Sequence, residues 1–395
     1  MMGKMVSAGI GTGRTSPRLT AIGFVLHCPT VTDNGVCWHD YQIVMPTDAF
    51  FLANSPYRSI MSTLIIPKDY RSALTVYETQ VAIGTIKRMF EDNLSRTLNL
   101  KRVSAPLFVE PQTGLNDDLN GIERPVEFDI KQTQSDAQIV HSLAKWKRMA
   151  LHKYGFPVGE GLCTDMNAVR RDDEMDNLHS IYVDQWDWEK VIDKATRNVE
   201  FLKKTVNAIV NSICDTAEAI KSQFPALSIS LSRDVKFIST QELEDIYPKM
   251  PPKEREHAYL KEHKTAFIMQ IGDVLKSGIK HDGRAPDYDD WALNGDIVFW
   301  NDVLQCAFEV SSMGIRVNEK SLDEQLTKAN CEHRRALPFH EMLLSGKLPL
   351  TIGGGIGQSR LCMLLLQKAH IGEVQVSVWD AKTLAGCNAA GIYLL

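Results

Sequence analysis

The chain of 395 residues lacks several features that would assign its class at once. It has no apolar run of the length that a transmembrane helix needs, about 20 residues, so we expect a soluble protein. Its formal net charge is -5, and it therefore lacks the basic excess of a dedicated nucleic-acid-binding protein. Its eight cysteines form no C-x-x-C pair and no Cys/His cluster. This excludes a zinc ribbon and favours a reducing compartment, the cytoplasm.

The first sixty residues differ from the rest of the chain. Residues 1–32 contain no acidic residue, carry Arg14 and Arg18, and are rich in Gly, Ser and Thr. This composition is faintly similar to an organelle transit peptide, and a start codon placed too early is the alternative. We predict that residues 1–60 are an N-terminal extension outside the core. Residues 61–395 are then one catalytic domain, which should fold and act without the extension.

The remaining chain alternates strand and helix patterns. Apolar residues recur at helical spacing over residues 74–98, as Ile86, Phe90 and Leu94 illustrate. Strands are predicted at residues 101–107, 126–130, 138–143, 161–170, 180–187, 235–239, 265–271, 295–300 and 303–317. Further helices are predicted at residues 190–224, 319–329 and 340–344, and from Gln241 and Pro252. The last two predicted strands form a hairpin, and the whole pattern indicates an α+β fold with a mostly antiparallel sheet.

A glycine-rich segment stands near the C-terminus. Gly353, Gly354, Gly355 and Gly357 precede Arg360 and an apolar run that predicts a buried helix. A helix that opens beneath a glycine turn offers backbone N–H groups to an anion, and Arg360 in its first turn could contact a phosphate or stack on a purine. A turn that merely caps a core helix is the alternative. A dinucleotide fold is disfavoured, because no βαβ unit follows.

The predicted hairpin carries two acids on neighbouring strands. Asp296 and Glu309 would either repel one another or share a divalent cation such as Mg²⁺. The alternation of a strand places Ser311 on the face of Glu309, with Ser312 beside it, and Arg316 further along could hold a carboxylate. Two acids on the polar outer face of a sheet remain the alternative.

Three other segments carry charged residues that could take part in chemistry. Residues 281–291 hold four acids and Arg284 beside proline and aromatic residues, which favours an ordered loop over a solvated turn. Arg170 ends a predicted strand before an acidic loop, where it could reach a triphosphate. Residues 141–148 are basic and contain Trp146, although a plain solvated face would show the same pattern.

Together these segments resemble the catalytic domain of class II aminoacyl-tRNA synthetases. The helix and strand that end at Pro106 resemble the first motif of that class, the dimer-interface element. Arg170 in its strand–loop–strand setting resembles the second motif, and Gly355-x-Gly357-x-x-Arg360 resembles the third.

The resemblance is closer to the ammonia-dependent asparagine synthetases, the aspartate–ammonia ligases, and covers residues 61–395. It rests on LNDDLNG at 115–121, HSLAKWKR at 141–148, YVDQWDWE at 182–189, RAPDYDDW at 284–291, LNGDI at 293–297 and AFEVSSMGIR at 307–316. It implies that ATP activates the β-carboxylate of aspartate as an acyl-adenylate. Ammonia then displaces AMP and gives asparagine. ATP as co-substrate, Mg²⁺, a homodimer and a cytoplasmic enzyme without nucleic-acid or membrane partners are implied as well.

The resemblance also implies a role for each matching residue. For the nucleotide, Arg170 would contact the α-phosphate, Arg360 the adenine or γ-phosphate, Gly355 and Gly357 would border the nucleotide, and Asp296 and Glu309 would hold Mg²⁺. For aspartate, Asp117 would hold the α-ammonium, Lys147 and Arg316 the carboxylate that is not activated, and Gln185, Arg284, Ser311 and Ser312 would complete the pocket. Asp289 would guide ammonium and is placed with Arg170 and Arg360 in the catalytic set.

Three other classes of protein fit the sequence less well or are excluded by it. An aminoacyl-tRNA synthetase needs an anticodon-binding module, and residues 61–395 leave no room for one. A non-catalytic regulator that kept the fold would be expected to lose Arg170, Arg360, Asp296 or Glu309, and all four are present. A glutamine-dependent synthetase is excluded because position 2 is Met2 instead of a nucleophilic cysteine.

Overall fold

A computed structural model describes residues 22–32, 35–45, 64–117 and 123–395. The chain divides into two compact units, Met1–Thr63 and Leu64–Leu395. In the first unit, β1 (Ile22–Thr32) pairs antiparallel with β2 (Gly35–Met45). No strand is predicted there from the sequence, because Thr, His and Cys interrupt the apolar residues without the clear alternation of a half-buried strand. The structure describes only residues 22–32 of the stretch with the transit-peptide composition and does not test that interpretation, and the boundary at Met61 stays a prediction.

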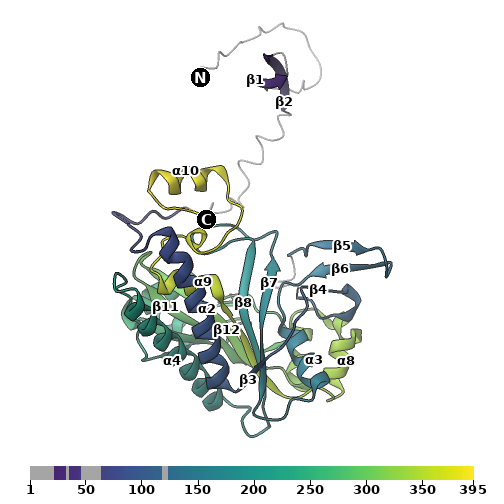
Figure 1. Ribbon diagram of the computed structural model, residues 1–395. Helices are drawn as coiled ribbons and strands as arrows, with labels where there is room; N and C mark the ends of the chain where they lie inside the picture. Colours follow the sequence, from purple (N-terminus) through teal and green to yellow (C-terminus); the bar gives the residue numbers. More distant parts are fainter. Residues whose placement is uncertain (1–21, 33–34, 46–63, 118–122) are drawn as a thin grey trace. The chain divides into compact units, whose positions relative to one another are not determined.

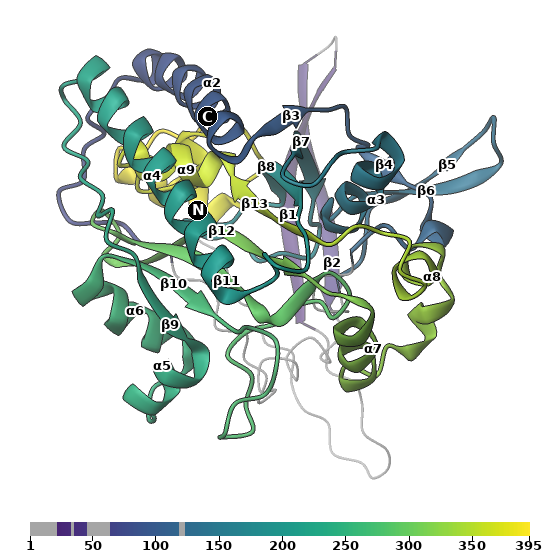
Figure 2. The same ribbon diagram turned by 90° about the horizontal axis from the view of Figure 1, so that it is seen from below.

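The second unit is built on one eight-stranded sheet with the order β3-β7-β8-β13-β12-β11-β10-β9 (Figures 1 and 2). Its strands are β3 (Leu100–Arg102), β7 (Gly161–Val169), β8 (Tyr182–Val191), β9 (Lys236–Ser239), β10 (Thr265–Met269), β11 (Asp289–Asn301), β12 (Cys306–Arg316) and β13 (Thr351–Gly357). The pairs β3–β7 and β9–β10 are parallel and the other neighbours are antiparallel. The predicted α+β class with a mostly antiparallel sheet is confirmed.

A smaller antiparallel sheet has the order β4-β6-β5. Its strands are β4 (Phe108–Val109), β5 (Glu127–Ile130) and β6 (Ser135–Ile139). The strand predicted at 138–143 therefore begins earlier and ends at Ile139. The single strand predicted at 101–107 is wrong as well: Pro106, which cannot donate a ladder hydrogen bond, lies between β3 and β4.

Helices cover the main sheet and carry some of the site residues. They are α2 (Val76–Leu98), α3 (Ala144–Tyr154), α4 (Val199–Gln223), α5 (Thr240–Ile246), α6 (Pro252–His263), α7 (Glu319–Lys328), α8 (Pro338–Leu344), α9 (Gln358–Leu365) and α10 (Ala381–Ala389), with short 3₁₀ turns η2 (Pro111–Thr113), η3 (Glu332–Ala336) and η4 (Ile371–Glu373). The helix predicted at 190–224 starts nine residues later, because Lys190 and Val191 still pair in β8 and Asn198 caps the helix. None of the described helices is long and apolar enough to cross a bilayer.

The main core lies on the face of the sheet that α2, α4 and α9 cover (Figure 1). Phe90 of α2 packs against Trp186 of β8 with ring centroids 4.8 Å apart, and both side chains are buried. Because side chains alternate along a strand, Trp186 and Trp188 point into this core. Gln185, Asp187 and Glu189 therefore point to the opposite face, where the polar site is built.

Candidate active site

A cavity of about 730 Å³ lies over the polar face of β8, β12 and β13. Among the residues selected from the sequence, those that line it are Arg170, Gln185, Arg284, Glu309, Ser312, Gly355, Gly357 and Arg360. The others, Asp117, Lys147, Asp289, Asp296, Ser311 and Arg316, do not line it, and most of them are buried next to residues that do. One cavity thus brings together eight residues from segments far apart in the sequence.

The glycine run forms a strand, so the predicted glycine turn is wrong. Gly353, Gly355 and Gly357 pair with Glu189, Asp187 and Gln185 of β8. A Cβ at Gly353 would lie 1.9 Å from Glu189 Oε2, and one at Gly355 would lie 2.2 Å from Gln185 Oε1. The glycines therefore make room for polar side chains that lie across the strand. The predicted buried helix does follow at once, as α9.

Beneath this strand lies a layer of buried ion pairs. Lys147 Nζ donates to Asp187 Oδ1 at 2.6 Å and to the carbonyl oxygen of Gly354 at 2.9 Å. Arg316 donates from Nη2 to Glu189 Oε2 at 2.8 Å and from Nη1 to Asp289. The lysine and the arginine selected from the sequence are therefore both oriented by carboxylates.

Asp187 and Glu189 were not selected from the sequence. Both are buried, and each holds one of the two cations of this layer. Alternation along a strand puts Asp187 and Gln185 on one face. The sequence could not show that the glycines of β13 pair with these two acids and leave space for their side chains.

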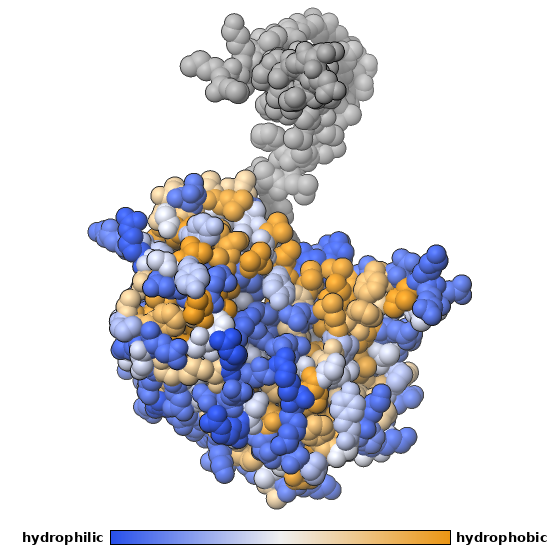
Figure 3. All heavy atoms as spheres, viewed as in Figure 1, coloured by the Kyte–Doolittle hydropathy of each residue, from blue (hydrophilic) through white to orange (hydrophobic). Residues whose placement is uncertain are grey.

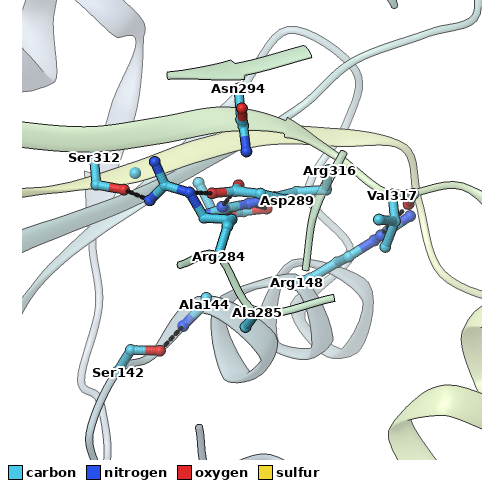
Figure 4. A network of polar contacts seen from close by, with 12 residues as sticks. Ser142, Ala144, Arg148, Arg284, Ala285, Asp289, Asn294, Ser312, Arg316 and Val317 are labelled. Atoms are coloured by element: carbon cyan, nitrogen blue, oxygen red, sulfur yellow. Dashed lines mark hydrogen bonds and ion pairs between the residues drawn. The ribbon is translucent and has the colours of Figure 1, made fainter. Parts of the chain in front are cut away.

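The loop before β11 is fixed by charged contacts at both ends. Arg284 Nη2 donates to Asp296 Oδ1 at 2.6 Å, and its Nη1 donates to Ser312 Oγ (Figure 4). Asp287, fully buried, accepts from Arg334 Nη1 at 2.9 Å and lies 3.0 Å from His340 Nε2. Lys145 Nζ, 3.3 Å from Asp287 Oδ2, adds a second cation beside that of Arg334. Such contacts hold Arg284 at the cavity wall, as an ordered loop would require.

Asp296 and Glu309 lie on adjacent strands, as predicted. Burial raises the pKa of Asp296 to about 7, with Arg284 opposing the shift and Glu309 adding to it. Burial also acts to raise the pKa of Glu309, but the charges of Arg360, Lys253 and Arg284 outweigh it and the pKa is lowered. The two carboxyl groups are thus shifted in opposite directions, with the charged form favoured at Glu309 and disfavoured at Asp296. A cation placed between them would favour the charged form of both.

A β-bulge separates two residues that the sequence analysis placed on one face. Ile297 pairs with Ser311 and Val298 with Glu309, so Val310 is the additional residue. Because a bulge breaks the alternation, Ser312 lines the cavity together with Glu309, whereas Ser311 does not. Ser311 is buried, with a hydroxyl that has no hydrogen-bond partner among the described residues.

Arg170 and Arg360 reach the cavity with donors to spare. Arg360 Nη1 donates to the Glu309 carbonyl oxygen at 3.1 Å, and its side chain is 22% exposed. Arg170 Nη2 donates to the carbonyl oxygen of His141 at 3.2 Å. The buried Nε of Arg170 has no hydrogen-bond partner within the described part of the chain. Arg360 Nη1 also lies 3.6 Å from Glu309 Oε1. Both guanidinium groups keep further donors with which they can bind an anion.

Asp117 lies at the end of a described segment and is 3% exposed. Ser142 Oγ donates to its Oδ2 at 3.1 Å, and its own carbonyl oxygen lies 3.0 Å from His141 Nδ1. It therefore stands next to the start of α3, the helix that carries Lys147.

Comparison with known proteins relates this chain to one family of ligases. The family model described as aspartate-ammonia ligase matches residues 77–391. The chain is 59% identical over 335 residues to an aspartate–ammonia ligase of Lactobacillus johnsonii, a match that covers 84% of this chain and 100% of that protein. It is 60% identical over 336 residues to an aspartate–ammonia ligase of Ruminiclostridium cellulolyticum, covering 85% of this chain and 100% of that protein.

Solved structures with a similar fold include two asparaginyl-tRNA synthetases. That of Entamoeba histolytica, in complex with asparaginyl-adenylate, matches with a TM-score of 0.56 and 12% identity over 76% of this chain and 66% of that one. That of Pyrococcus horikoshii, also complexed with asparaginyl-adenylate, matches with a TM-score of 0.52 and 14% identity over 86% and 78% of the two chains. These similarities show a class II synthetase fold.

Proposed function

The chain belongs to the aspartate–ammonia ligase family, and on this premise we propose how its residues divide the work between ATP, aspartate and ammonia. The enzyme joins ammonia to the β-carboxylate of aspartate and gives asparagine. In the proposed route the carboxylate oxygen attacks the α-phosphorus of ATP and diphosphate leaves. The nitrogen of ammonia then attacks the acyl carbon, and AMP leaves with the oxygen that linked it.

Arg170 and Arg360 are proposed to bind the phosphates of ATP. Both line the cavity, and both retain guanidinium donors that no described side chain occupies fully. Phosphoryl transfer depends mostly on position and on neutralisation of charge, which two arginines from different elements can supply. Gly355 and Gly357 would let the nucleotide approach the strand, because no Cβ stands in the way.

Aspartate is proposed to bind over the ion-pair layer, with its free carboxylate toward Lys147 and Arg316. Asp187 and Glu189 hold these two cations in fixed positions before any substrate arrives, so the cations need not be reoriented when aspartate binds. Gln185, Arg284 and Ser312 would complete the pocket, whereas Ser311, turned away by the bulge, would not. Asp117, which lies beside the start of α3, would hold the α-ammonium group of aspartate.

Asp289 is proposed to attract ammonium. It is 1% exposed and bound to Arg316, and Arg284 Nε lies 3.8 Å from its Oδ2. A carboxylate oxygen at this position can accept a hydrogen bond from an incoming ammonium ion. Ammonia must be uncharged to attack, so one proton has to leave the incoming ammonium.

The Asp296/Glu309 pair is proposed to hold Mg²⁺. Magnesium is usually bound by one or two carboxylates together with substrate phosphates and water, and this pair supplies the carboxylates. No group of three or more His, Cys, Asp or Glu that could hold a metal ion occurs among the described residues, so the remaining ligands would come from ATP and water. When bound, Mg²⁺ would neutralise phosphate charge and orient the leaving diphosphate.

A cytoplasmic homodimer is proposed as the working form. Its interface would run over residues 74–107, where Val76, Tyr77 and Val81 of α2 are 42%, 79% and 44% exposed. Figure 3 shows apolar surface in this region and over α10. A symmetric pair would cover such a patch with its own copy.

The observation that carries the proposed chemistry is the joint placement of Arg170, Arg360 and Glu309 in one cavity. The test is an assay of all products from ATP, aspartate, ammonium and Mg²⁺. AMP and diphosphate should appear with asparagine in equal amounts, and only when aspartate and ammonium are both present. ADP and inorganic phosphate as the nucleotide products would refute the adenylate route.

A further inference from the structure

Lys253 is a cation of the cavity wall that the sequence did not single out. It stands in the first turn of α6 and lines the cavity together with Asp282, Glu309 and Arg360. Its Nζ lies 3.2 Å from Asp282 Oδ2 and 3.5 Å from Glu256 Oε2, and its side chain is 65% exposed. Lys253 is thus held only by contacts at the surface of the cavity.

The backbone that carries Lys253 is fixed more firmly than its side chain. Arg255, in the same part of α6, is buried and pairs with Glu244 at 3.2 Å. Glu256 Oε1 lies 2.8 Å from Nε2 of His281, which is also buried. This second contact joins α6 to the loop that carries Arg284. The ammonium group of Lys253 can therefore exchange one ion-pair partner for another while the backbone of α6 stays fixed beside the cavity.

The charges around Lys253 leave this part of the cavity short of positive charge for a polyphosphate. Asp282 lines it and would repel phosphate oxygens, whereas Glu309, which also lines it, is the proposed Mg²⁺ ligand. Arg284 is committed to Asp296 and Ser312, which leaves Arg360 and Lys253 as the cations facing Glu309. An exposed ion pair such as Lys253–Asp282 contributes little to stability. The lysine can therefore leave Asp282 and bind a phosphate with only a small loss of free energy.

We propose that Lys253 is a further phosphate-binding residue: it would exchange Asp282 for the terminal phosphates of ATP and then hold the diphosphate product. This inference rests on the proposed function, because it needs ATP in this cavity. Lysine is well suited to this role, since its flexible stem and compact ammonium group can follow a leaving group, whereas the planar guanidinium of an arginine is confined to a few orientations.

The first test compares Lys253→Met with the matched variant Lys261→Met, in which an exposed lysine on the same helix, outside the cavity lining, is removed. In K253M we expect the KM for ATP and the inhibition constant of diphosphate to rise about tenfold, as befits one lost charge-assisted hydrogen bond. The KM for aspartate should change less than about twofold by the same reasoning. K261M should match the wild-type enzyme in all three constants, and K253R, which keeps the charge but not the flexible ammonium group, should recover only part of the loss.

A second variant separates phosphate binding from simple neutralisation of Asp282. Without Lys253, the carboxylate of Asp282 is left uncompensated and would itself repel ATP. In the double variant K253M/D282N this repulsion is removed. If Lys253 binds phosphate, the double variant still binds ATP and diphosphate more weakly than the single variant D282N. Equal constants in those two variants would overturn the proposal.

The failure of this inference differs from a failure of the proposed function. Wild-type enzyme that makes no AMP and diphosphate would refute the adenylate route. Active wild-type enzyme with unchanged ATP and diphosphate constants in K253M would refute only the role of Lys253. A rise in the KM for aspartate equal to that for ATP would also refute it, because it would indicate general damage to the site. Melting curves of each variant with and without ATP and Mg²⁺ report folding and binding separately.

Discussion

Arg170 and Arg360 come from different elements, the end of β7 and the first turn of α9, and they line the same cavity. If both stabilise negative charge on the transferring phosphate, neither can replace the other. The loss of one such contact typically costs about 3 kcal/mol, or roughly a hundredfold in rate. We therefore predict that R170A and R360A each lower kcat about a hundredfold and leave the melting temperature nearly unchanged.

Arg171 provides the control for that prediction, because it is the exposed neighbour of Arg170 and does not line the cavity. R171A should keep wild-type turnover. Near-wild-type turnover in R170A or R360A would mean that the nucleotide binds elsewhere.

His370 gives a prediction about pH. Its side chain is fully buried, and its Nδ1 accepts a hydrogen bond from Gly372 N at 3.0 Å. Burial lowers its pKa to about 4, with Asp176 opposing the shift. Below about pH 6.5, the ordinary pKa of histidine, the unfolded chain gains a proton that the folded protein cannot take up. The contribution of neutral, buried His370 to the free energy of unfolding is therefore fully present above about pH 6.5 and is lost as the pH falls towards 4.

In H370N the amide oxygen can still accept the hydrogen bond from Gly372. We predict that the free energy of unfolding of this variant falls by about 2 kcal/mol less than that of the wild-type protein between pH 7 and pH 4.5. Urea unfolding at both pH values measures it. The surface variant H152N reports the effect of removing an exposed imidazole. Parallel stability profiles for H370N and the wild-type protein would contradict the role given to His370.

At the scale of elements, the sequence predicted most strands of the main sheet and the helices that cover it. The hairpin with Asp296 and Glu309 followed from its alternation and its turn residues. The glycine run did not, because glycine marks a turn and a close approach between strands equally well. Only the pairing of β13 with β8 distinguishes a turn from a close approach between strands. The paired residues lie about 170 positions apart, so the local sequence gives no sign of this pairing. The bulge at Val310, which selects Ser312 over Ser311, was hidden for the same reason.

The glycines of β13 should therefore respond differently to alanine. A Cβ at Gly354 would lie 2.5 Å from Met313 Cβ and 2.8 Å from the Ser312 carbonyl oxygen, and neither atom can move without shifting β12. We predict that G354A costs about 1–3 kcal/mol of stability, as overpacking usually does. A Cβ at Gly355 meets the tip of Gln185, which can rotate away. G355A should remain folded and bind aspartate more weakly.

Thermal unfolding and steady-state kinetics of the two variants distinguish these effects. G84A is the control: it lies on α2, where the added methyl group would be 3.5 Å from the flexible end of Arg88 and should not destabilise the helix. Wild-type stability in G354A, or wild-type aspartate KM in G355A, would contradict the close packing between strands.

At the scale of the whole molecule, the exposed apolar residues of α2 lead to a prediction about assembly. The double variant Y77E/V81E places two charges in the proposed interface and should sediment as a monomer, whereas the wild-type enzyme should sediment as a dimer. V274E, which changes a residue that is 58% exposed in the loop between β10 and β11, is the matched control and should stay dimeric. A wild-type enzyme that is active and monomeric at the assay concentration would contradict the dimer.

The central claim, that one cavity forms an aspartyl-adenylate and then transfers the acyl group to ammonia, can be tested by following a single oxygen atom. Aspartate labelled with ¹⁸O in its β-carboxylate is converted with ATP and ammonium, and the products are analysed by mass spectrometry. The adenylate route predicts one ¹⁸O atom in the phosphate group of AMP for each asparagine formed, because the linking oxygen leaves with AMP. Label in inorganic phosphate, or AMP without label, would contradict the account.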